Sequence, residues 1–203
     1  MVAIIDYGMG NVASVQKALN FLNIENCITN NHQEIKDATS ILLPGVGSFY
    51  QGMKNLKELG LDELLTDEVV NKKKKFLGIC LGMQLILEKG MEPEETKGLG
   101  WIQGSVVKFE MKDLSIPHMG WNNILIKNPC FFDNCESLDF YFIHSYHAVP
   151  INKDDIAATV EYGIEAVASI KKDNIFATQF HPEKSQSSGL MLINNYLKEL
   201  RKT

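Results

Sequence analysis

The chain has 203 residues, enough to bury a hydrophobic core without disulfide or metal support, and we expect one domain over residues 1–203. Its 45% hydrophobic and 22% charged content is typical of a globular protein, and its formal net charge of −5 argues against a nucleic-acid-binding protein. No run reaches the roughly 18 to 20 apolar residues of a membrane-spanning helix, so we expect no membrane segment.

The N-terminus and the cysteines both indicate a cytoplasmic protein. Residues 1–6 read Met-Val-Ala-Ile-Ile-Asp, without the basic start or the cleavage site of a signal peptide. The four cysteines are not spaced as pairs of zinc ligands. Cys130 and Cys135 could bridge a loop, but reduced thiols are the default in a chain with no export signal.

Strands and helices alternate along the first half of the chain. Apolar runs and helical spacing predict strands at 2–6, 27–29, 40–43 and 76–79, and helices at 11–21, 48–56, 61–70 and 80–88. Asn11 is placed to cap the first helix, and the turn Pro44–Gly47 breaks the third strand. We expect His32 to lie in a polar loop and Lys72–Lys75 to be a solvated face.

The second half of the chain is richer in strands. We expect them at 101–109, 123–126, 139–143, 156–162, 165–170 and 175–180, and a last helix at 188–200. Turns with Gly, Pro and Asn separate these strands, so part of the sheet is expected to be antiparallel. The predicted fold class is therefore α/β: a doubly wound, mostly parallel central sheet flanked by helices, with an antiparallel extension in the second half.

One cysteine stands between two glycines where a predicted strand meets a predicted helix, in Gly78-Ile79-Cys80-Leu81-Gly82. Small residues two positions away let such a turn pass close to neighbouring strands. The turn would place Cys80 at a helix N-terminus, where free N–H groups and the helix dipole favour a thiolate. We interpret Cys80 as a nucleophile; a buried cysteine at a strand end is the alternative.

His181 is the best candidate for the base that such a nucleophile needs. It follows the strand 175–180, in the same parallel layer as Cys80, and Glu183 comes two residues later. In an extended segment, residues i and i+2 project to one side, so we expect Glu183 to orient the His181 ring. A histidine and a glutamate in a surface loop are the alternative. For His118, His144 and His147, hydrogen-bonded structural roles are the usual case.

The turn Pro44-Gly45-Val46-Gly47 is a candidate for part of an oxyanion hole. Glycines after a strand let backbone N–H groups approach a reacting centre. The N–H of Leu81, the residue after the nucleophile, would be the second donor. The spacing alone fits an ordinary strand-to-helix turn as well as it fits an oxyanion hole.

The segments Gly78–Gln84 and Gln179–Glu183 together resemble the motifs of the class I (triad) glutamine amidotransferases. Further segments narrow the resemblance to the branch of this family that serves histidine biosynthesis: 5–11, 44–47, 116–122, 141–146 and 180–185. They follow the family's order over essentially the whole chain. The resemblance implies a flavodoxin-like fold and the hydrolysis of L-glutamine through a γ-glutamyl thioester, and it implies no metal or organic cofactor.

The resemblance also implies roles for individual residues. It makes Cys80 the nucleophile, His181 the base and acid, and Glu183 the carboxylate that orients it. It implies an oxyanion hole of Val46, Gly47 and Leu81. It implies contacts to the glutamine substrate from Gln84, His144, Ser145 and Tyr146.

In this branch of the family the ammonia passes to a (β/α)8-barrel cyclase subunit, and the resemblance implies the same partner here. The implied partner-facing residues are Asn11, His118, Met119, Trp121, Asn122, Tyr141 and Lys184. Trp121 offers a large anchor area, which is typical of interface centres; a place in the core is the alternative.

Three other functions stay open on the sequence. A paralogous pair could supply the ammonia to the amidination of a surface sugar, with the same glutaminase chemistry. A catalytically idle regulatory subunit is a second alternative, against which the intact Cys80, His181 and Glu183 speak. A free-standing hydrolase or cysteine peptidase is the third, against which the partner-facing segment 117–122 speaks.

Overall fold

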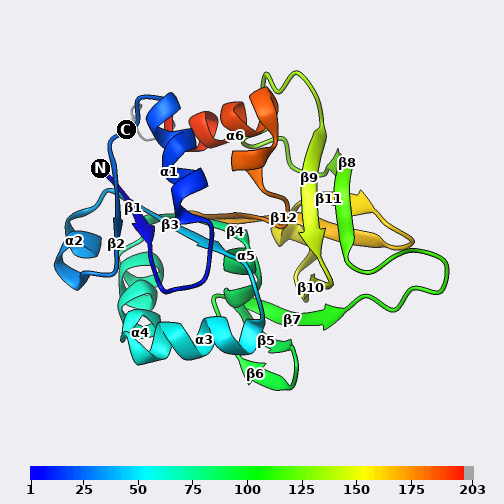
Figure 1. The fold of residues 1–203 in the computed structure, drawn as a ribbon, viewed down its shortest axis with the longest axis horizontal. Coiled ribbons are helices and arrows are strands. Elements are labelled where there is room, and N and C mark those ends of the chain that lie inside the picture. Colours follow the sequence, from blue (N-terminus) through cyan, green and yellow to red (C-terminus); the bar gives the residue numbers. More distant parts are fainter. Residues whose placement is uncertain (199–203) are drawn as a thin grey trace.

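A layer of short parallel strands forms the centre of the molecule (Figure 1). The computed structural model describes residues 1–198, and within them the parallel strands lie in the order β2-β1-β3-β4-β13. Their bounds in that order are Asn26–Thr29, Val2–Ile5, Ser40–Gly45, Lys75–Cys80 and Ile175–Thr178. Every residue of β1, β3 and β13 is buried, as expected for strands covered on both faces.

Helices cover both faces of this layer (Figure 1). On one face lie α1 (Val12–Phe21) and α6 (Gln186–Lys198), and on the other lie α3 (Phe49–Glu58) and α4 (Leu61–Thr66). The side chains of β1 alternate between the two faces. Ile4 packs into the core shared with α1 and α6, and Ile5 into the core shared with α3 and α4.

Beyond β13 the same sheet continues with antiparallel strands in the order β12-β11-β8-β9. These strands span Glu165–Lys172, Ile156–Glu161, His118–Ile126 and Asp139–His144. A separate sheet has the order β10-β7-β5-β6, with strands at Tyr146–Pro150, Ile102–Lys108, Leu87–Met91 and Glu95–Lys97. The predicted α/β class, with its parallel centre and antiparallel extension, is confirmed.

The predicted helix at 80–88 is wrong in its second half. Helix α5 (Leu81–Leu85) is short, and β5 begins two residues after it. Gly90 of β5 lies against the ring of Phe49, and β5 pairs in parallel with β7. This long-range pairing overrides the helical spacing of the segment, which local pattern alone cannot reveal.

Three further elements escaped the sequence analysis: α2 (His32–Asp37), β6 and β10. Asn31 caps α2 by accepting hydrogen bonds from the amides of Gln33 and Glu34, so His32 begins a helix instead of lying in a loop. Asn31 followed by Glu34 is a capping pattern that marks this start in the sequence. The last helix begins at Gln186, and the predicted positions 199–200 lie outside the described residues.

Two local predictions need correction. Pro44 and Gly45 do not break the third strand, because both pair with β4 as part of β3. The run Lys72–Lys75 is not simply a solvated face, because Lys72 and Lys74 each lie 2.7 Å from a carboxylate oxygen of the buried Glu68. Burial would raise the pKa of Glu68, but the hydrogen bonds from Lys72 and Lys74 outweigh it and lower this pKa.

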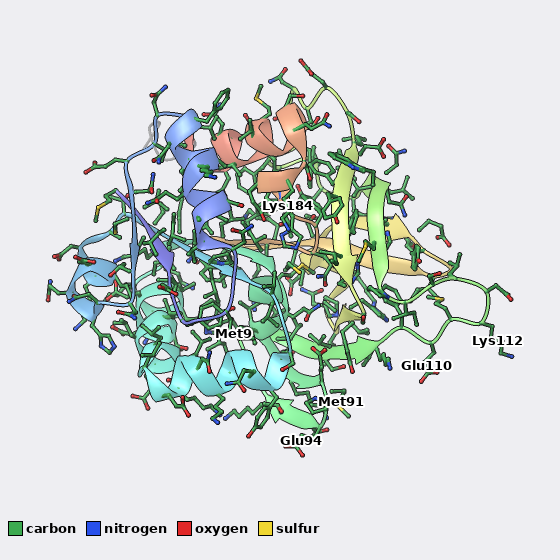
Figure 2. The ribbon with its side chains drawn as sticks, viewed as in Figure 1. Met9, Met91, Glu94, Glu110, Lys112 and Lys184 are labelled. Carbon is green, nitrogen blue, oxygen red and sulfur yellow. The ribbon has the colours of Figure 1, made fainter. Side chains whose placement is uncertain are left out.

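The remaining short turns connect the main elements. A π-helical turn at Asp67–Asn71 follows α4, and 3₁₀ turns occupy Lys153–Asp155 and Pro182–Lys184. No helix within residues 1–198 is long and apolar enough to cross a membrane. Figure 2 shows Glu110 and Lys112 on the loop between β7 and β8, which extends away from the sheets.

Candidate active site

The predicted nucleophile and base lie at the ends of two neighbouring parallel strands. Cys80 is the last residue of β4, and His181 follows β13, which pairs with β4 up to Ile79. The carboxyl ends of parallel strands are the usual ligand-binding edge of a doubly wound sheet. The chain therefore brings together two side chains that are about 100 positions apart in sequence.

Cys80 sits on the predicted sharp turn, with a strained backbone. Its φ of 53° and ψ of −107° are unusual for a residue with a side chain, and it directly precedes α5. Gly78 and Gly82 make the turn possible. A Cβ on Gly78 would lie 2.9 Å from the Gly82 carbonyl oxygen, and a Cβ on Gly82 would overlap the carbonyl oxygen of Leu43.

Glu183 holds the ring of His181, as predicted, but through different geometry. The Nδ1 atom of His181 lies 2.8 Å from Glu183 Oε1, and both side chains are almost fully buried. The segment is a 3₁₀ turn, not the extended chain that the sequence suggested. The Ser185 hydroxyl donates to the carbonyl of His181 at 2.7 Å, and the backbone N–H of His181 donates to Tyr141 on β9 at 2.9 Å.

The electrostatics around His181 favour its charged form. Burial disfavours a charged ring, but the negative charge of Cys80 and the contact with Glu183 outweigh it and raise the pKa of His181 to about 10. Glu183 engages Nδ1, which leaves Nε2 for the sulfur. Within residues 1–198 this Nε2 atom is buried without a well-formed hydrogen bond, so it is available to a bound substrate.

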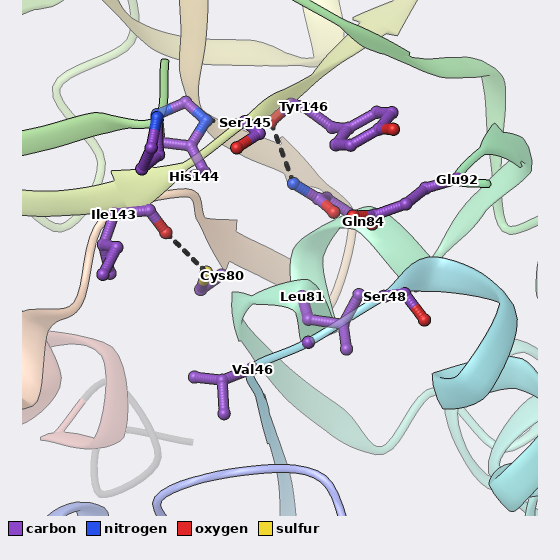
Figure 3. Close-up of a pocket in the computed structure, with 12 residues that line it drawn as sticks. Val46, Ser48, Cys80, Leu81, Gln84, Glu92, Ile143, His144, Ser145 and Tyr146 are labelled. Atoms are coloured by element: carbon purple, nitrogen blue, oxygen red, sulfur yellow. Dashed lines mark hydrogen bonds between the residues drawn. The ribbon is translucent and has the colours of Figure 1, made fainter. Parts of the chain in front are cut away.

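The Cys80 sulfur has polar neighbours besides His181. Its side chain is 6% exposed, and Sγ lies 3.8 Å from the carbonyl oxygen of Ile143 (Figure 3). On another side, the amide nitrogen of Gln179 approaches Sγ to 3.7 Å. Gln179 is completely buried, and its own carbonyl oxygen accepts a 3.0 Å hydrogen bond from Gln84.

A cavity of about 360 Å³ opens in front of the sulfur (Figure 3). Its walls come from the turn after β3, from the elbow and α5, and from the end of β9. Figure 3 shows the Gln84 amide donating to the carbonyl of Tyr146, a contact of 3.0 Å. The lining residues are Val46, Gly47, Ser48, Cys80, Leu81, Gln84, Glu92, Pro117, Ile143, His144, Ser145 and Tyr146.

The residues predicted for the oxyanion hole line this cavity together with Cys80. Gly47 has a φ of 110°, a backbone conformation that residues with side chains rarely adopt, so a substitution there would be strained. Leu81 is the first residue of α5, and a first-turn N–H has no acceptor within its own helix. Backbone donors from two elements therefore border the space in front of the sulfur.

The residues predicted to contact glutamine line the same cavity, with one difference. Gln84, Ser145 and Tyr146 line the cavity as expected. His144 also lines it, but both of its ring nitrogens are engaged, with His118 Nδ1 at 3.1 Å and with the Tyr146 carbonyl at 2.8 Å. Its ring therefore supports the wall, and burial lowers its pKa to about 3, which keeps the ring neutral.

Two polar residues of the site escaped the sequence analysis, Glu92 and Gln179. Glu92 lines the cavity, and burial raises the pKa of its carboxyl group despite a hydrogen bond from the Phe49 amide. Glu92 follows strand β5, whose first two residues were predicted as the end of a helix, so no pattern pointed to it. Gln179 is the first residue of the family-like segment Gln179–Glu183, and its position two residues before His181 was the available signal.

The predicted partner-facing residues separate into an exposed group and a buried one. Met119 and Trp121 are 59% and 48% exposed, so Trp121 is not a core residue. Trp121 packs edge-on against Tyr141, and Lys184 lies over the Tyr141 ring at 5.8 Å. Figure 2 labels Lys184, which ends the 3₁₀ turn after β13. We call Met119, Trp121, Tyr141 and Lys184 the aromatic face.

His118 corrects the prediction, because its side chain is only 3% exposed. It stacks between the rings of Phe142 and Tyr162, so it cannot itself contact a partner in this arrangement. Asn122 is half-buried and donates to the carbonyl of Glu161 at 3.1 Å. Asn11 is exposed, but its side chain also caps α1 by accepting from the Ser14 amide.

Comparison with known proteins places these features in a sequence context. The family model for "Glutamine amidotransferase class-I" matches residues 3–199. A relative from Campylobacter jejuni, "Imidazole glycerol phosphate synthase subunit HisH 1", is 51% identical over 97% of this chain and 98% of its own length. A Methanococcus maripaludis relative, "Imidazole glycerol phosphate synthase subunit HisH 2", is 46% identical over 98% of this chain and all of its own length.

Solved structures show the same fold at low sequence identity. One described as "Crystal structure of glutamine amidotransferase" aligns over all of both chains with a TM-score of 0.78 and 17% identity. Another, "Structure of PurLQS from Thermotoga maritima", aligns over 98% of this chain and 98% of its own, with a TM-score of 0.74 and 16% identity.

The close approach at Gly82 predicts the effect of one added methyl group. Gly82→Ala should lower the free energy of unfolding by about 3 kcal/mol, because a Cβ there meets the rigid backbone of β3. Urea denaturation of the purified chain measures it. Gly52→Ala is the control, since its Cβ meets the flexible ends of Leu81 and Leu85. Equal stability of both variants would contradict the tight elbow.

Proposed function

The chain belongs to the class I glutamine amidotransferase family, and we propose that it is the glutaminase subunit of an imidazole glycerol phosphate synthase. Its relatives of 46–51% identity carry that subunit name over nearly their full length. The observation that carries the proposal is the burial of Cys80 and the His181–Glu183 pair beside a cavity with backbone donors on one wall.

In the first half of the proposed reaction, Cys80 attacks the side-chain amide carbon of L-glutamine as a thiolate. The protonated His181 gives its Nε2 proton to the departing nitrogen, so ammonia leaves and a γ-glutamyl thioester remains. The hydrogen bond between Glu183 and Nδ1 keeps the other ring nitrogen directed at the reacting atoms. The high pKa of His181 suits a group that must arrive as an acid.

In the second half, the now neutral His181 accepts a proton from water, which attacks the thioester. Glutamate leaves, and Cys80 returns as a thiolate beside a protonated His181. Both halves pass through a tetrahedral intermediate with a negative oxygen. Gly47 and Leu81 line the same cavity as Cys80, and their amides are the proposed donors to this oxygen, with Val46 in the same turn as Gly47.

The cavity also offers groups for the rest of the substrate. Within the described residues that line it, Glu92 is the one carboxylate, so we assign it to the α-ammonium group of glutamine. Its half-buried position makes an arriving cation favourable, because the carboxylate is poorly solvated there. Gln84, Ser145 and Tyr146 face the same space and complete the proposed amino-acid site.

The ammonia is proposed to pass to a (β/α)8-barrel cyclase subunit that docks on the aromatic face. Its exposed Met119 and Trp121 offer a large apolar area of the kind that forms interface centres, and Lys184 adds a charge of the kind that lies at the rim. The acceptor would then be the ribonucleotide substrate of histidine biosynthesis, with imidazole glycerol phosphate and AICAR as products. The cytoplasmic location expected from the sequence stays a prediction.

Replacing the nucleophile tests the proposed chemistry in the assembled enzyme. Cys80→Ala in complex with the cyclase subunit should lose glutamine hydrolysis by roughly 1,000-fold or more, because no thioester can form. Glutamate release is the measurement. Supplied with ammonium salt, the same complex should still cyclise its ribonucleotide at the wild-type rate. Retained glutaminase activity in the variant would contradict the triad. If no ribonucleotide accelerates glutamine hydrolysis by the wild-type complex, the ammonia has another acceptor.

Glu92→Gln tests the assignment of the α-ammonium site. The KM for glutamine should rise by about tenfold, with a smaller change in kcat, because a charge-assisted hydrogen bond to the substrate is lost. The wild type should reject glutaramic acid, which lacks the α-amino group, whereas the variant should no longer prefer glutamine over it. Glu94→Gln, an exposed neighbour, is the control. An unchanged KM in Glu92→Gln would remove Glu92 from the substrate site.

Trp121→Ala tests the docking surface. Affinity for the cyclase subunit should fall by about 30-fold, since exposed tryptophans at interface centres contribute about 2 kcal/mol or more. Isothermal titration calorimetry with the purified cyclase subunit measures it. Phe21→Ala removes another exposed aromatic residue, from the far end of α1, and should bind like the wild type. Unchanged affinity in Trp121→Ala would place the partner on another surface.

A further inference from the structure

Gln179 is a fully buried polar side chain to which the triad chemistry gives no role. It follows β13, two residues before His181, and its solvent exposure is 0%. Its amide reaches two other residues of the site. The carbonyl oxygen accepts from Gln84 at 3.0 Å, and the nitrogen approaches the Cys80 sulfur at 3.7 Å. A buried polar group in a protein core is retained only when its hydrogen bonds are satisfied.

Chemistry fixes which end of the Gln179 amide faces the sulfur. The backbone carbonyl of Tyr146 can only accept, so Gln84 must turn its NH₂ group toward it. The second hydrogen of that NH₂ group then points at Gln179, which must accept it with its side-chain carbonyl oxygen. The nitrogen of Gln179 is therefore left on the side of Cys80. The opposite amide orientation would place two donors face to face.

The same carbonyl of Tyr146 anchors a second branch of hydrogen bonds. His144 must carry its proton on Nδ1 to donate to it, so His144 Nε2 accepts from Nδ1 of His118. The remaining nitrogen of His118 accepts from Asn122 at 3.4 Å. Burial lowers the pKa of His118 to about 4, which is consistent with this neutral tautomer. Tyr146 is therefore held from two sides, and its carbonyl is a fixed reference for the amides of Gln84 and Gln179.

We propose that Gln179 is a catalytic residue whose amide N–H donates to the thiolate of Cys80. The Ile143 carbonyl near the sulfur can accept from a thiol but gives nothing to a thiolate, so it offers no such stabilisation. The Gln179 hydrogen bond also leaves the His181 Nε2 side of the sulfur open to substrate. When the sulfur forms the thioester it loses its negative charge, so the hydrogen bond from Gln179 weakens. Hydrolysis of the thioester restores the thiolate and, with it, this hydrogen bond.

This inference deepens the proposed glutaminase function and rests on it, but its test needs neither glutamine nor a partner. Iodoacetamide alkylates a thiolate and not a thiol, so the rate at the Cys80 peptide, followed by mass spectrometry against pH, reports the thiolate. Gln179→Met removes the donor, and Gln179→Glu replaces it with a carboxyl group that becomes an acceptor when it ionises. The pH of half-maximal alkylation should rise by about one unit in Gln179→Met, and further in Gln179→Glu, where a second negative charge faces the sulfur.

The controls separate this effect from a loss of packing. Gln103→Glu makes the same change at an exposed position on β7 and should leave the midpoint in place. Besides burial, the charge of Cys80 acts on the pKa values of His181 and Tyr7, and neither residue is altered in these variants. A merely structural Gln179 would change melting temperature and alkylation amplitude but not the midpoint. An unmoved midpoint in a folded variant would overturn the proposal.

A measurement on the wild-type chain tests the hydrogen bond from Gln179 to Cys80 even if a variant does not fold. The side-chain ¹⁵N–¹H₂ signal of Gln179 should move with pH at the midpoint of Cys80 alkylation, and should not move in Cys80→Ala. A Gln179 signal that ignores the titration would overturn the proposal. Absence of glutamine turnover alongside a titrating Gln179 signal would instead refute the glutaminase function and leave the hydrogen bond to the sulfur standing.

Discussion

The active site depends on one steric constraint, the contact between the Cys80 elbow and the backbone of β3. Gly82 lies so close to the Leu43 carbonyl that a side chain cannot fit, and a Cβ on Gly78 would lie 2.9 Å from the Gly82 carbonyl oxygen. This packing holds Cys80 at a positive φ, where the chain turns directly from strand into helix. The sulfur is thereby lifted to the edge of the sheet where the loops after β3 and β13 meet. Oxyanion donors, base and cavity are all positioned relative to this turn.

Around that turn, backbone carbonyl groups decide how the polar side chains are oriented. The Tyr146 carbonyl accepts from both Gln84 and His144, and it thereby sets two amide orientations and two histidine tautomers. A carbonyl can serve as such a reference because it cannot exchange donor for acceptor. The buried amides and imidazoles near the cavity therefore have one consistent arrangement, although each of them in isolation could take either orientation.

The sequence was sufficient to predict those parts of the site that depend on local chain geometry. The elbow around Cys80 and the His181–Glu183 pair both lie in short segments, and the strand pattern placed both segments in the same layer. Glu92 could not be predicted, because its place at the cavity depends on strands that are paired over long distances. For His118, the expectation from the residues alone, a hydrogen-bonded structural histidine, is confirmed, and the partner-facing role that the resemblance implied is not. The helical spacing after Cys80 was overridden by the pairing of β5 with β7, which also brings Glu92 to the cavity. The 3₁₀ turn at 182–184 shows that a correct contact can be predicted from an incorrect backbone conformation.

The hydrogen bond from the His181 amide to Tyr141 joins the acid–base residue to the edge of the sheet. Cys80 ends a central strand, with β3 and β13 bonded on either side, so displacing it would disrupt the middle of the sheet. The peptide group of His181 is attached to β9, which ends the strand order and has β8 as its one sheet neighbour within residues 1–198. An edge strand moves at a lower free-energy cost than a central one. Because Tyr141 is also part of the aromatic face, strand β9 connects the proposed docking surface directly to the peptide group of the acid–base residue.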